Sequence, residues 1–411
     1  MRRQKIQALA AGAVALSLVV AACGSDDDSS SEPAATDAGS ETTDAGSETT
    51  DAASETTEAE GDMAECETVD EVSLQLQWFT QAQFAGYYAA QDKGFYEAMC
   101  LDVTIVEGGV EIVPQTQLAN GDVDFALAWV PKALASREAG ADIVNIAQIY
   151  QRSGTLQVSF VDQGITTPAD FEGRTIGNWG FGNEYEIFAA LAEAGLDPAT
   201  DVELIGQQFD MVALLEGDID AAEAMTYNEY AQVLEAENPD TGELYQPDDF
   251  NVISYEEIGV GMLQDAIWAD AGRLESDADY KDQATRFVAA SMEGWTYCRD
   301  NAEECRDIVV ASGSTLGASH QLWQTNEVNK LIWPSPDGIG YIDQAAWDRT
   351  AEISLNTPNL EGATVITAPP TEGAFTNEIV EAAWALLDDM GLDLFGDGFT
   401  PIDVTLEPGG E

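Results

Sequence analysis

Positive charge is the most obvious shortage in this 411-residue chain. It contains 15 Lys and Arg against 76 Asp and Glu, which gives a formal net charge of −61 at pH 7. Binding to nucleic acid and docking on anionic lipid both require a basic surface, so the composition argues against both. A solvated acidic shell, typical of solubility or salt adaptation, explains the carboxylates; a cation-binding surface is the alternative.

Residues that commonly bind metals or act as catalytic bases are also scarce. The chain has a single histidine, His320, and no Cys-x-x-Cys pair, so a metal site is a weak alternative. It lacks a Gly-x-x-x-x-Gly-Lys phosphate loop and a Gly-x-Ser-x-Gly elbow, and no relay partner for His320 is evident. A paired-carboxylate hydrolase stays an alternative because acids are abundant, although no local pattern singles out a pair. We therefore expect a protein that is not an enzyme and holds no metal or cofactor.

The N-terminus is where positive charge does occur. Three basic residues within the first five precede an apolar run over residues 6–20, which is too short for a membrane span. The run ends in Val-Ala-Ala before Cys23, a pattern typical of a bacterial lipoprotein signal. We expect residues 1–22 to be removed and Cys23 to carry lipid, which anchors the protein at the extracytoplasmic face of the cell membrane. An ordinary secretory signal with an incidental cysteine is the alternative.

Residues 23–68 have the composition of a tether. From Gly24 to about Thr68 the chain has no Lys or Arg and few large apolar residues, and a seven-residue near-repeat (Thr-Asp-Ala-Gly-Ser-Glu-Thr) starts at Thr36. Such a segment cannot bury enough apolar surface to offset its ordering entropy. It has no hydrophobic face to stack, so we interpret the repeat as an acidic disordered spacer rather than a solenoid.

Four cysteines follow Cys23, and an even number in an exported protein favours two disulfides. We pair Cys66 with Cys100 and Cys298 with Cys305. Four cysteines allow three connectivities, so the other two pairings stay open.

Strand-like and helical stretches alternate twice along the folded part, which predicts an α/β fold of parallel sheets covered by helices. The first run has expected strands at 72–78, 101–106 and 124–129 with helices at 84–96 and 113–120; the second has strands at 174–178, 202–205 and 221–225 with helices at 184–194 and 211–216.

Two strand-like stretches, near residues 156–161 and 252–261, connect the runs and indicate two lobes with two crossings. A cleft between lobes is a common place for a small-molecule site. We expect a first lobe (69–160), a second lobe (161–258), a mainly helical return to the first lobe (259–395) and a C-terminal tail (396–411).

Three stretches carry a resemblance to a known family. The segment 74–90, with Lys93-Gly94-Phe95-Tyr96 and residues 101–103 after it, resembles the opening of the NMT1/THI5-like substrate-binding proteins, and the stretches 118–125 and 177–184 fit as well. The superfamily includes alkanesulfonate and taurine binders, and the resemblance covers roughly residues 72–300. It implies a two-lobed, type II-like periplasmic-binding fold that works, as a monomer, with the permease and ATPase of an ABC importer.

The resemblance also implies a class of ligand. One branch binds a pyrimidine precursor of thiamine and a sister branch resembles riboflavin binders; Gln77-Trp78 and Gln81-Ala82-Gln83 look closer to these than to the sulfonate binders. A flat heteroaromatic ring binds best between aromatic faces, with amides or carboxylates at its edge. The expected faces are Trp78, Tyr87, Trp129, Trp179, Phe181 and Tyr227, and the expected edge partners are Gln77, Gln81, Gln83, Asn183, Glu184, Asn228 and Glu229.

Each of these residues has a structural alternative. The aromatic residues could simply pack in the core, and Glu184 and Glu229, which compete as acceptors of an exocyclic amine, could be solvated surface carboxylates. The Gly-rich turn before residue 184 presents backbone N–H groups to an anion, which keeps an alkanesulfonate or taurine ligand open.

One branch of the family contains thiamine-pyrimidine synthases that use pyridoxal phosphate and an active-site histidine. Here residues 83–86 read Gln-Phe-Ala-Gly, without a histidine, and residues 178–182 replace the Cys-rich motif of that branch. We expect a binding protein rather than a synthase. A sensor or adhesion lipoprotein that feeds no importer is a further alternative.

Overall fold

The computed structural model describes residues 66–410. The expected signal peptide (1–22), the lipidation of Cys23 and almost all of the expected tether (23–68) lie outside the described residues and stay predictions. Between residues 66 and 410, no helix combines the length and the apolar character needed to cross a membrane.

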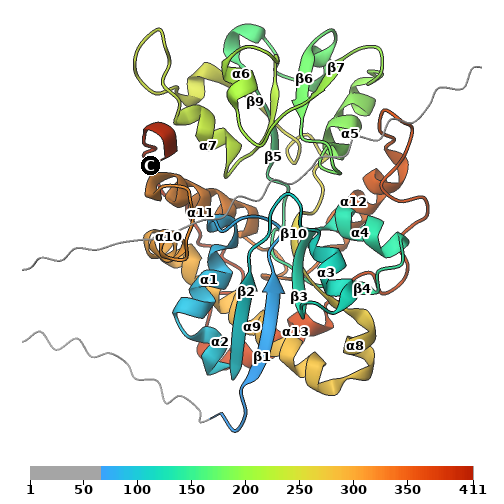
Figure 1. Cartoon of the computed structure of the whole chain (residues 1–411), viewed down its shortest axis with the longest axis vertical. Coiled ribbons are helices and arrows are strands. Elements are labelled where there is room, and N and C mark those ends of the chain that lie inside the picture. The colour runs from blue at the N-terminus through green and yellow to red at the C-terminus, as the bar shows by residue number, and fades with distance from the viewer. Residues whose placement is uncertain (1–65, 411) are drawn as a thin grey trace, which may run out of the picture. The chain divides into compact units, whose positions relative to one another are not determined.

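A five-stranded mixed sheet forms the centre of what we call the larger half of the molecule, in the lower part of Figure 1. The strand order is β2-β1-β3-β10-β4; β1 runs parallel to β2 and β3, whereas β10 runs antiparallel to β3 and β4. Continuous burial along β3 and β4 fits a sheet covered on both faces. The strands are β1 (Asp70–Gln75), β2 (Leu101–Val106), β3 (Phe125–Trp129), β4 (Ile143–Gln148) and β10 (Asp265–Asp270).

Helices from both ends of the described chain cover this sheet (Figure 1). From the N-terminal part come the 3-10 helix η1 (Ala82–Phe84), α1 (Ala85–Asp92), α2 (Phe95–Ala98), α3 (Pro114–Asn120) and α4 (Val130–Glu138). From the C-terminal part come α8 (Ala271–Ser276), α9 (Ala278–Asp300), α10 (Ala302–Ala311), α11 (Ala318–Ile332), α12 (Gln344–Asn356), α13 (Glu378–Leu387) and the 3-10 helix η5 (Asp388–Met390). The last 3-10 helix, η6 (Pro408–Gly410), lies against α11 instead.

The long helix α9 organises the core of the larger half. The side chain of Asp277 caps its N-terminus by accepting hydrogen bonds from the backbone N–H groups of Asp279 and Tyr280. The ring of Phe287 stacks on Phe125 and Tyr96, with centroid distances of 4.5 and 5.5 Å. These contacts fasten the C-terminal helices to the first strands of the chain.

A pair of glycines lets α1 and α9 approach closely. A Cβ on Gly294 would lie 2.0 Å from the carbonyl oxygen of Gly86, and a Cβ on Gly86 would lie 2.2 Å from the indole ring of Trp295. Neither position can hold a larger side chain without moving a helix. Tyr87 beside this contact is buried, and its ring meets Trp295 edge-on at 5.6 Å.

The smaller half of the molecule, in the upper part of Figure 1, has two short sheets. The first is antiparallel, in the order β8-β5-β9, and the second is the parallel pair β6-β7, which a bridge between Ile176 and Ala221 connects to the first. Its elements are β5 (Thr155–Phe160), β6 (Thr175–Asn178), β7 (Glu203–Gly206), β8 (Ala222–Met225), β9 (Phe250–Ser254), α5 (Tyr185–Ala194), α6 (Val212–Leu215), α7 (Glu229–Leu234) and the 3-10 helices η2 (Val161–Gln163), η3 (Pro168–Phe171) and η4 (Pro247–Asp249).

The strands and helices lie where the sequence places them, but the expectation of purely parallel sheets is wrong. The chain returns to the larger sheet through β10, which enters from the opposite end and is therefore antiparallel to its neighbours. The strand-like stretches near 156–161 and 252–261 are β5 and β9, which pair with each other inside the smaller half. We propose that the crossings between the lobes are the segments 149–154 and 255–264, so the first lobe ends before residue 160.

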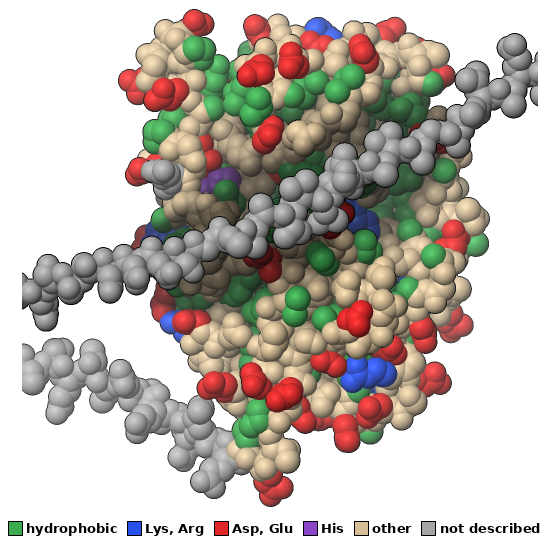
Figure 2. Space-filling model, in the orientation of Figure 1, with side chains coloured by type: hydrophobic (Ala, Val, Ile, Leu, Met, Phe, Trp, Pro, Cys, Tyr) green, Lys and Arg blue, Asp and Glu red, His purple; other side chains and the backbone are tan. Residues whose placement is uncertain are grey.

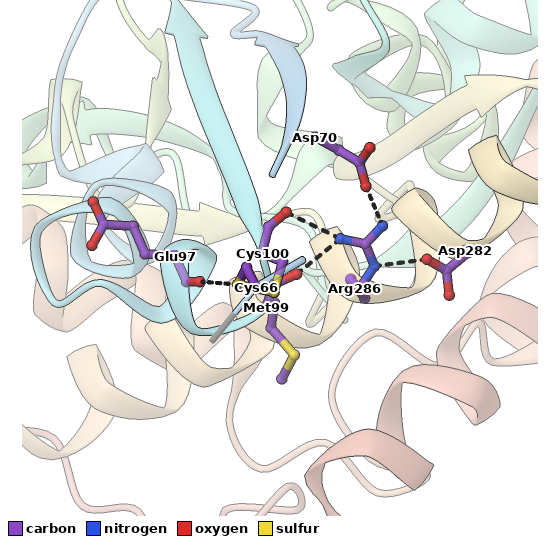
Figure 3. The surroundings of a disulfide bond; sticks show 7 residues. All are labelled: Cys66, Asp70, Glu97, Met99, Cys100, Asp282 and Arg286. Carbon is purple, nitrogen blue, oxygen red and sulfur yellow. Dashed lines mark hydrogen bonds and ion pairs between the residues drawn. A yellow bond between two sulfur atoms is a disulfide. The ribbon is translucent and has the colours of Figure 1, made fainter. Parts of the chain in front are cut away.

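Two disulfides fasten the larger half, Cys66–Cys100 and Cys298–Cys305, with Cα–Cα distances of 5.7 and 5.5 Å. Around the first, Arg286 of α9 donates hydrogen bonds to the backbone carbonyls of Met99 and Cys100 and pairs with Asp70 and Asp282 (Figure 3). The start of β1, the turn before β2 and helix α9 are thus held at one point.

The segment expected as a C-terminal tail (396–411) makes contacts up to Gly410. The backbone N–H of Ile402 donates to the side-chain oxygen of Asn326, and that of Gly409 donates to the carbonyl of Glu235. This segment therefore touches α11 and the end of α7.

Candidate ligand-binding cleft

A cavity of about 690 Å³ lies between the larger and the smaller half. The larger half contributes the segment after β1, the loop 109–115 and the junction of β3 with α4; the smaller half contributes the turn before α5 and the segment 225–229. Figure 2 shows the face of the molecule hollowed between the two halves, with hydrophobic side chains around the hollow.

A second cavity of about 680 Å³ lies between α12 and the segment 369–375. Its two large rings, Trp347 and Phe375, come from neighbouring segments of the larger half and pack on each other with centroids 4.6 Å apart. The cavity between the halves has separate aromatic and polar groups on opposite walls, and we therefore build the candidate site there.

Most of the residues that the sequence singles out line this cavity; their role in binding a ligand stays a prediction. They are Gln77, Trp78, Gln81, Gln83, Trp129, Trp179, Phe181, Asn183, Tyr227, Asn228 and Glu229.

Tyr87 and Glu184 are not among the lining residues. Tyr87 faces α9, because the face of α1 that carries it packs on that helix. Glu184 turns back on its own turn, where its carboxylate accepts a hydrogen bond of 2.8 Å from the backbone N–H of Gly182.

A network of buried side chains forms the wall of the larger half. The amide nitrogen of Gln81 donates to the side-chain oxygen of Gln83 at 2.7 Å, and Gln83 donates to Asp265 at 3.1 Å. The indole N–H of Trp129 donates to the other oxygen of Asp265 at 2.9 Å. The antiparallel register places Asp265 directly opposite Trp129. These contacts fix three lining side chains before any ligand arrives.

Burial raises the pKa of Asp265 to about 7, although the hydrogen bonds from Trp129 and Gln83 act in the opposite direction. Local sequence gave no signal for this residue, because its partners are distant along the chain. Tyr150 adds support, since its hydroxyl donates to the backbone carbonyl of Gln83 at 2.8 Å.

Three rings from both halves meet in the cleft. Trp78 contacts Phe209 with centroids 4.8 Å apart, and Phe209 stacks on Trp179 at 6.0 Å with an interplanar angle of 25°. The sequence reasoning did not include Phe209, although it follows β7 much as Trp179 follows β6. Aromatic faces are thus present on both sides of the cavity.

Buried carboxylates mark the wall of the smaller half. Glu229 accepts hydrogen bonds from the backbone N–H of Met225 at 3.0 Å and from the amide of Asn228 at 2.7 Å, and burial raises its pKa. Glu229 is therefore not a solvated surface residue. Glu223 lies deeper: one oxygen accepts from the backbone N–H of Trp179 at 2.7 Å, and burial raises its pKa too.

The turn before α5 has an unusual backbone. Gly180, Phe181 and Gly182 all have positive φ angles, of 66°, 56° and 88°. The left-handed region is unfavourable for a residue with a Cβ, so Phe181 is strained. Its side chain is 87% exposed beside the cavity, which leaves a large aromatic face open to a ligand or to solvent.

His320 does have partners, contrary to the sequence reasoning. Its Nδ1 lies 3.0 Å from the carboxylate of Glu235, and its Nε2 lies 3.0 Å from the side-chain oxygen of Asn228. His320 belongs to α11 in the larger half, whereas Asn228 and Glu235 flank α7 in the smaller half. The histidine does not line the cavity, so it connects the two halves rather than acting on a ligand.

Lys132 is another lining residue that the sequence reasoning missed. It lies in the first turn of α4, and its Nζ is 5.2 Å from the centroid of the Trp129 ring. Within residues 66–410, no group of three His, Cys, Asp or Glu side chains is arranged to hold a metal ion.

Comparison of the sequence with known proteins identifies a family and two relatives. The NMT1/THI5-like family model matches residues 81–305. The chain is 25% identical to the formylaminopyrimidine-binding protein of Halalkalibacterium halodurans over 60% of this chain and 72% of that protein. It is 27% identical to the riboflavin-binding protein RibY of Chloroflexus aurantiacus over 76% of this chain and 87% of that protein.

Among solved structures, the fold is similar to that of the periplasmic aliphatic sulphonate binding protein SsuA of Escherichia coli. The TM-score is 0.51 at 13% identity, and the match covers 84% of this chain and 95% of that one. The expected α/β periplasmic-binding fold is confirmed. The family match spans more than half of the sequence and includes every element of the smaller half, so the chain belongs to the NMT1/THI5-like family.

Proposed function

We propose that this protein is the solute-binding component of an ABC importer and that its ligand is a thiamine pyrimidine or a close heteroaromatic relative. The observation that carries the proposal is the arrangement of the cleft, where aromatic rings from both halves flank a cavity that has Glu229 at one wall and the Gln81–Gln83 pair at the other. Rings bind well between such faces, and the carboxylate matches an exocyclic amine.

The relatives support this class of ligand. One is named for a formylaminopyrimidine and the other for riboflavin, and both ligands are flat rings with donors and acceptors at the edge. Riboflavin is the second candidate, because the match to its binding protein spans more of this chain and because 690 Å³ exceeds the space that one pyrimidine ring fills.

We propose a binding role rather than catalysis. The wall of the larger half holds hydrogen-bonded amides around one buried acid, Asp265, and the two relatives compared above are named as binding proteins. Closure of the two halves around the ligand, by hinge motion at the segments 149–154 and 255–264, would create the surface that the permease reads. Lipid on Cys23 would keep the protein beside the importer, as a monomer at the extracytoplasmic face of the membrane.

A thermal-shift and calorimetry panel tests the proposal on the purified chain. The panel contains 4-amino-5-hydroxymethyl-2-methylpyrimidine, the analogue in which a formylaminomethyl group replaces the hydroxymethyl group, riboflavin and taurine. A ligand at 100 times its Kd adds about 2.7 kcal/mol to stability, which a melting curve resolves. A shift with a pyrimidine or with riboflavin supports the proposal, and a shift with taurine alone would overturn it in favour of a sulfonate binder.

The variant Glu229→Gln sharpens this test. It keeps the size of the side chain and removes the charge, so the affinity for an aminopyrimidine should fall about 10- to 100-fold, the value of a hydrogen bond to a charged group. Glu257→Gln is the matched control, because Glu257 is an exposed carboxylate outside the cleft. If the two variants bound the aminopyrimidine with equal affinity, Glu229 would not be a ligand-binding residue.

A further inference from the structure

Lys132 stands out among the cations of the molecule. Of the residues that line the cleft within 66–410, it alone carries a positive charge. Every other Lys and Arg in this part of the chain has an ion pair or a side-chain hydrogen bond. The ammonium of Lys132 has neither within the described chain, and its one specific contact is the face of the Trp129 ring at 5.2 Å.

The side chain of Lys132 reaches from the larger half to the smaller half. Its backbone belongs to α4 in the larger half, yet a Cβ added to Gly182 in the smaller half would lie 3.7 Å from Cγ and 3.9 Å from Cε of the lysine. The side chain therefore reaches from the Trp129 ring to the strained turn before α5. A Cβ at position 182 would only touch the lysine side chain, so the positive φ of 88° is what favours glycine there.

Three carboxyl groups act on this ammonium electrostatically, but none of them forms an ion pair with it within residues 66–410. Burial lowers the pKa of Lys132, while Glu184, Glu223 and Asp265 act in the opposite direction. A partly buried cation without an ion-pair partner is costly, and cations in such places normally meet an anion.

Glu229, which lines the same cavity, has the complementary chemistry. It is an acceptor at the wall of the smaller half, held by Met225 and Asn228. A ligand that satisfies both residues has a hydrogen-bond donor for Glu229 and a negatively charged oxygen group for Lys132. The ring between them would occupy the space beside Trp78 and Trp179.

We propose that Lys132 binds an anionic oxygen substituent of the ligand, so that the protein prefers an acidic heteroaromatic compound, such as a phosphate ester, to its neutral parent. This inference rests on the proposed function, because it names a chemical feature of the ligand of the same cleft. It makes Lys132 a residue that determines specificity, while the rings and Glu229 provide the binding that both forms of the ligand share.

The test compares matched pairs of ligands by calorimetry on the purified chain. The pairs are 4-amino-5-hydroxymethyl-2-methylpyrimidine with its phosphate, and riboflavin with riboflavin 5′-phosphate. The wild-type protein should bind the phosphorylated member of a pair about 10- to 100-fold more tightly, as expected for a new charge-assisted hydrogen bond. In Lys132→Met this preference should disappear, because the affinity for the phosphorylated member should fall 10- to 100-fold more than the affinity for the neutral member.

Lys132→Arg separates charge from packing. It keeps the positive charge and the contact with Trp129, so it should retain a preference for the phosphorylated member; melting curves show whether each variant is folded. An unchanged preference in Lys132→Met, or tighter wild-type binding of the neutral member, would overturn the inference while the proposed function stands. If the wild-type protein binds none of the four compounds, the proposed function fails and the inference fails with it.

Discussion

The two walls of the cleft are built in different ways. The wall of the larger half is a hydrogen-bonded network in which Gln81, Gln83 and Trp129 converge on Asp265, and all four side chains are buried where the 3-10 helix η1 meets the ends of β3 and β10. The wall of the smaller half depends on a strained turn with the exposed ring of Phe181 and on carboxylates held by backbone N–H groups. The first wall is therefore preorganised, whereas the second is suited to adjust when the ligand is bound.

This comparison predicts unequal effects of removing one ring from each wall. Trp78→Ala deletes a ring that contacts Phe209 across the cleft. The affinity for the ligand should therefore fall about 100-fold, as it does when a central aromatic residue of a binding site is removed. Phe181→Ala removes an exposed ring and relieves the strain of its backbone only in part, so the loss should stay below about tenfold. Titration calorimetry with the best ligand of the panel measures both, and Phe395→Ala, an exposed ring outside the cleft, is the control. An equal loss for the two variants would contradict the contrast between the walls.

The contact between the halves at His320 should matter for stability rather than for the chemistry of binding. His320→Ala leaves Asn228 and the buried Glu235 without their partner, so the free energy of unfolding should fall by about 2–4 kcal/mol. Denaturant unfolding followed by tryptophan fluorescence measures this loss. A change below about 0.5 kcal/mol would show that the two halves do not depend on this contact.

A third prediction concerns pH and the buried carboxyl group of Glu186 in α5. It accepts a hydrogen bond from the backbone N–H of Met262 in the second crossing, and burial raises its pKa to about 7. Because the folded state favours the protonated carboxyl group, the protonated Glu186 makes its full contribution to the free energy of unfolding below pH 4.5, the pKa in the unfolded chain. This contribution is lost as the pH rises through 7, the pKa in the folded chain. Glu186→Gln should therefore be as stable as the wild type near pH 4.5 and more stable by about 3 kcal/mol at pH 8.

Thermal and denaturant unfolding at several pH values check this result. Glu257→Gln serves again as an exposed control, and its stability difference from the wild type should not vary with pH. If the advantage of Glu186→Gln were the same at pH 4.5 and pH 8, the carboxyl group would not titrate in this range and the buried position of Glu186 would be wrong.

Local patterns predicted much of this molecule. The alternating strands and helices, and the aromatic and amide residues around Gln77-Trp78 and Trp179, can be identified because each depends on residues that are close in sequence. The resemblance of residues 74–90 supplied the family, which the match over residues 81–305 then showed.

The features that were missed depend on pairing across long stretches of chain. Asp265 reaches the cleft only because β10 is antiparallel to β3, and the partners of His320 lie 85 and 92 residues before it. Tyr87 was predicted to be one of the aromatic faces of the cleft, but helix α1 turns it toward α9. Lys132 has no local signal, since a lysine in the first turn of a helix is usually solvated.

A crystal structure of the protein with the best pyrimidine or flavin ligand tests the central claim most directly. The account predicts a ring in the cleft against the face of Trp78 or Trp179, with an amine or ring N–H on Glu229 and an oxygen group toward Lys132. Ligand density in the other cavity beside Trp347, or a ring in the cleft that contacts neither tryptophan, would contradict the account.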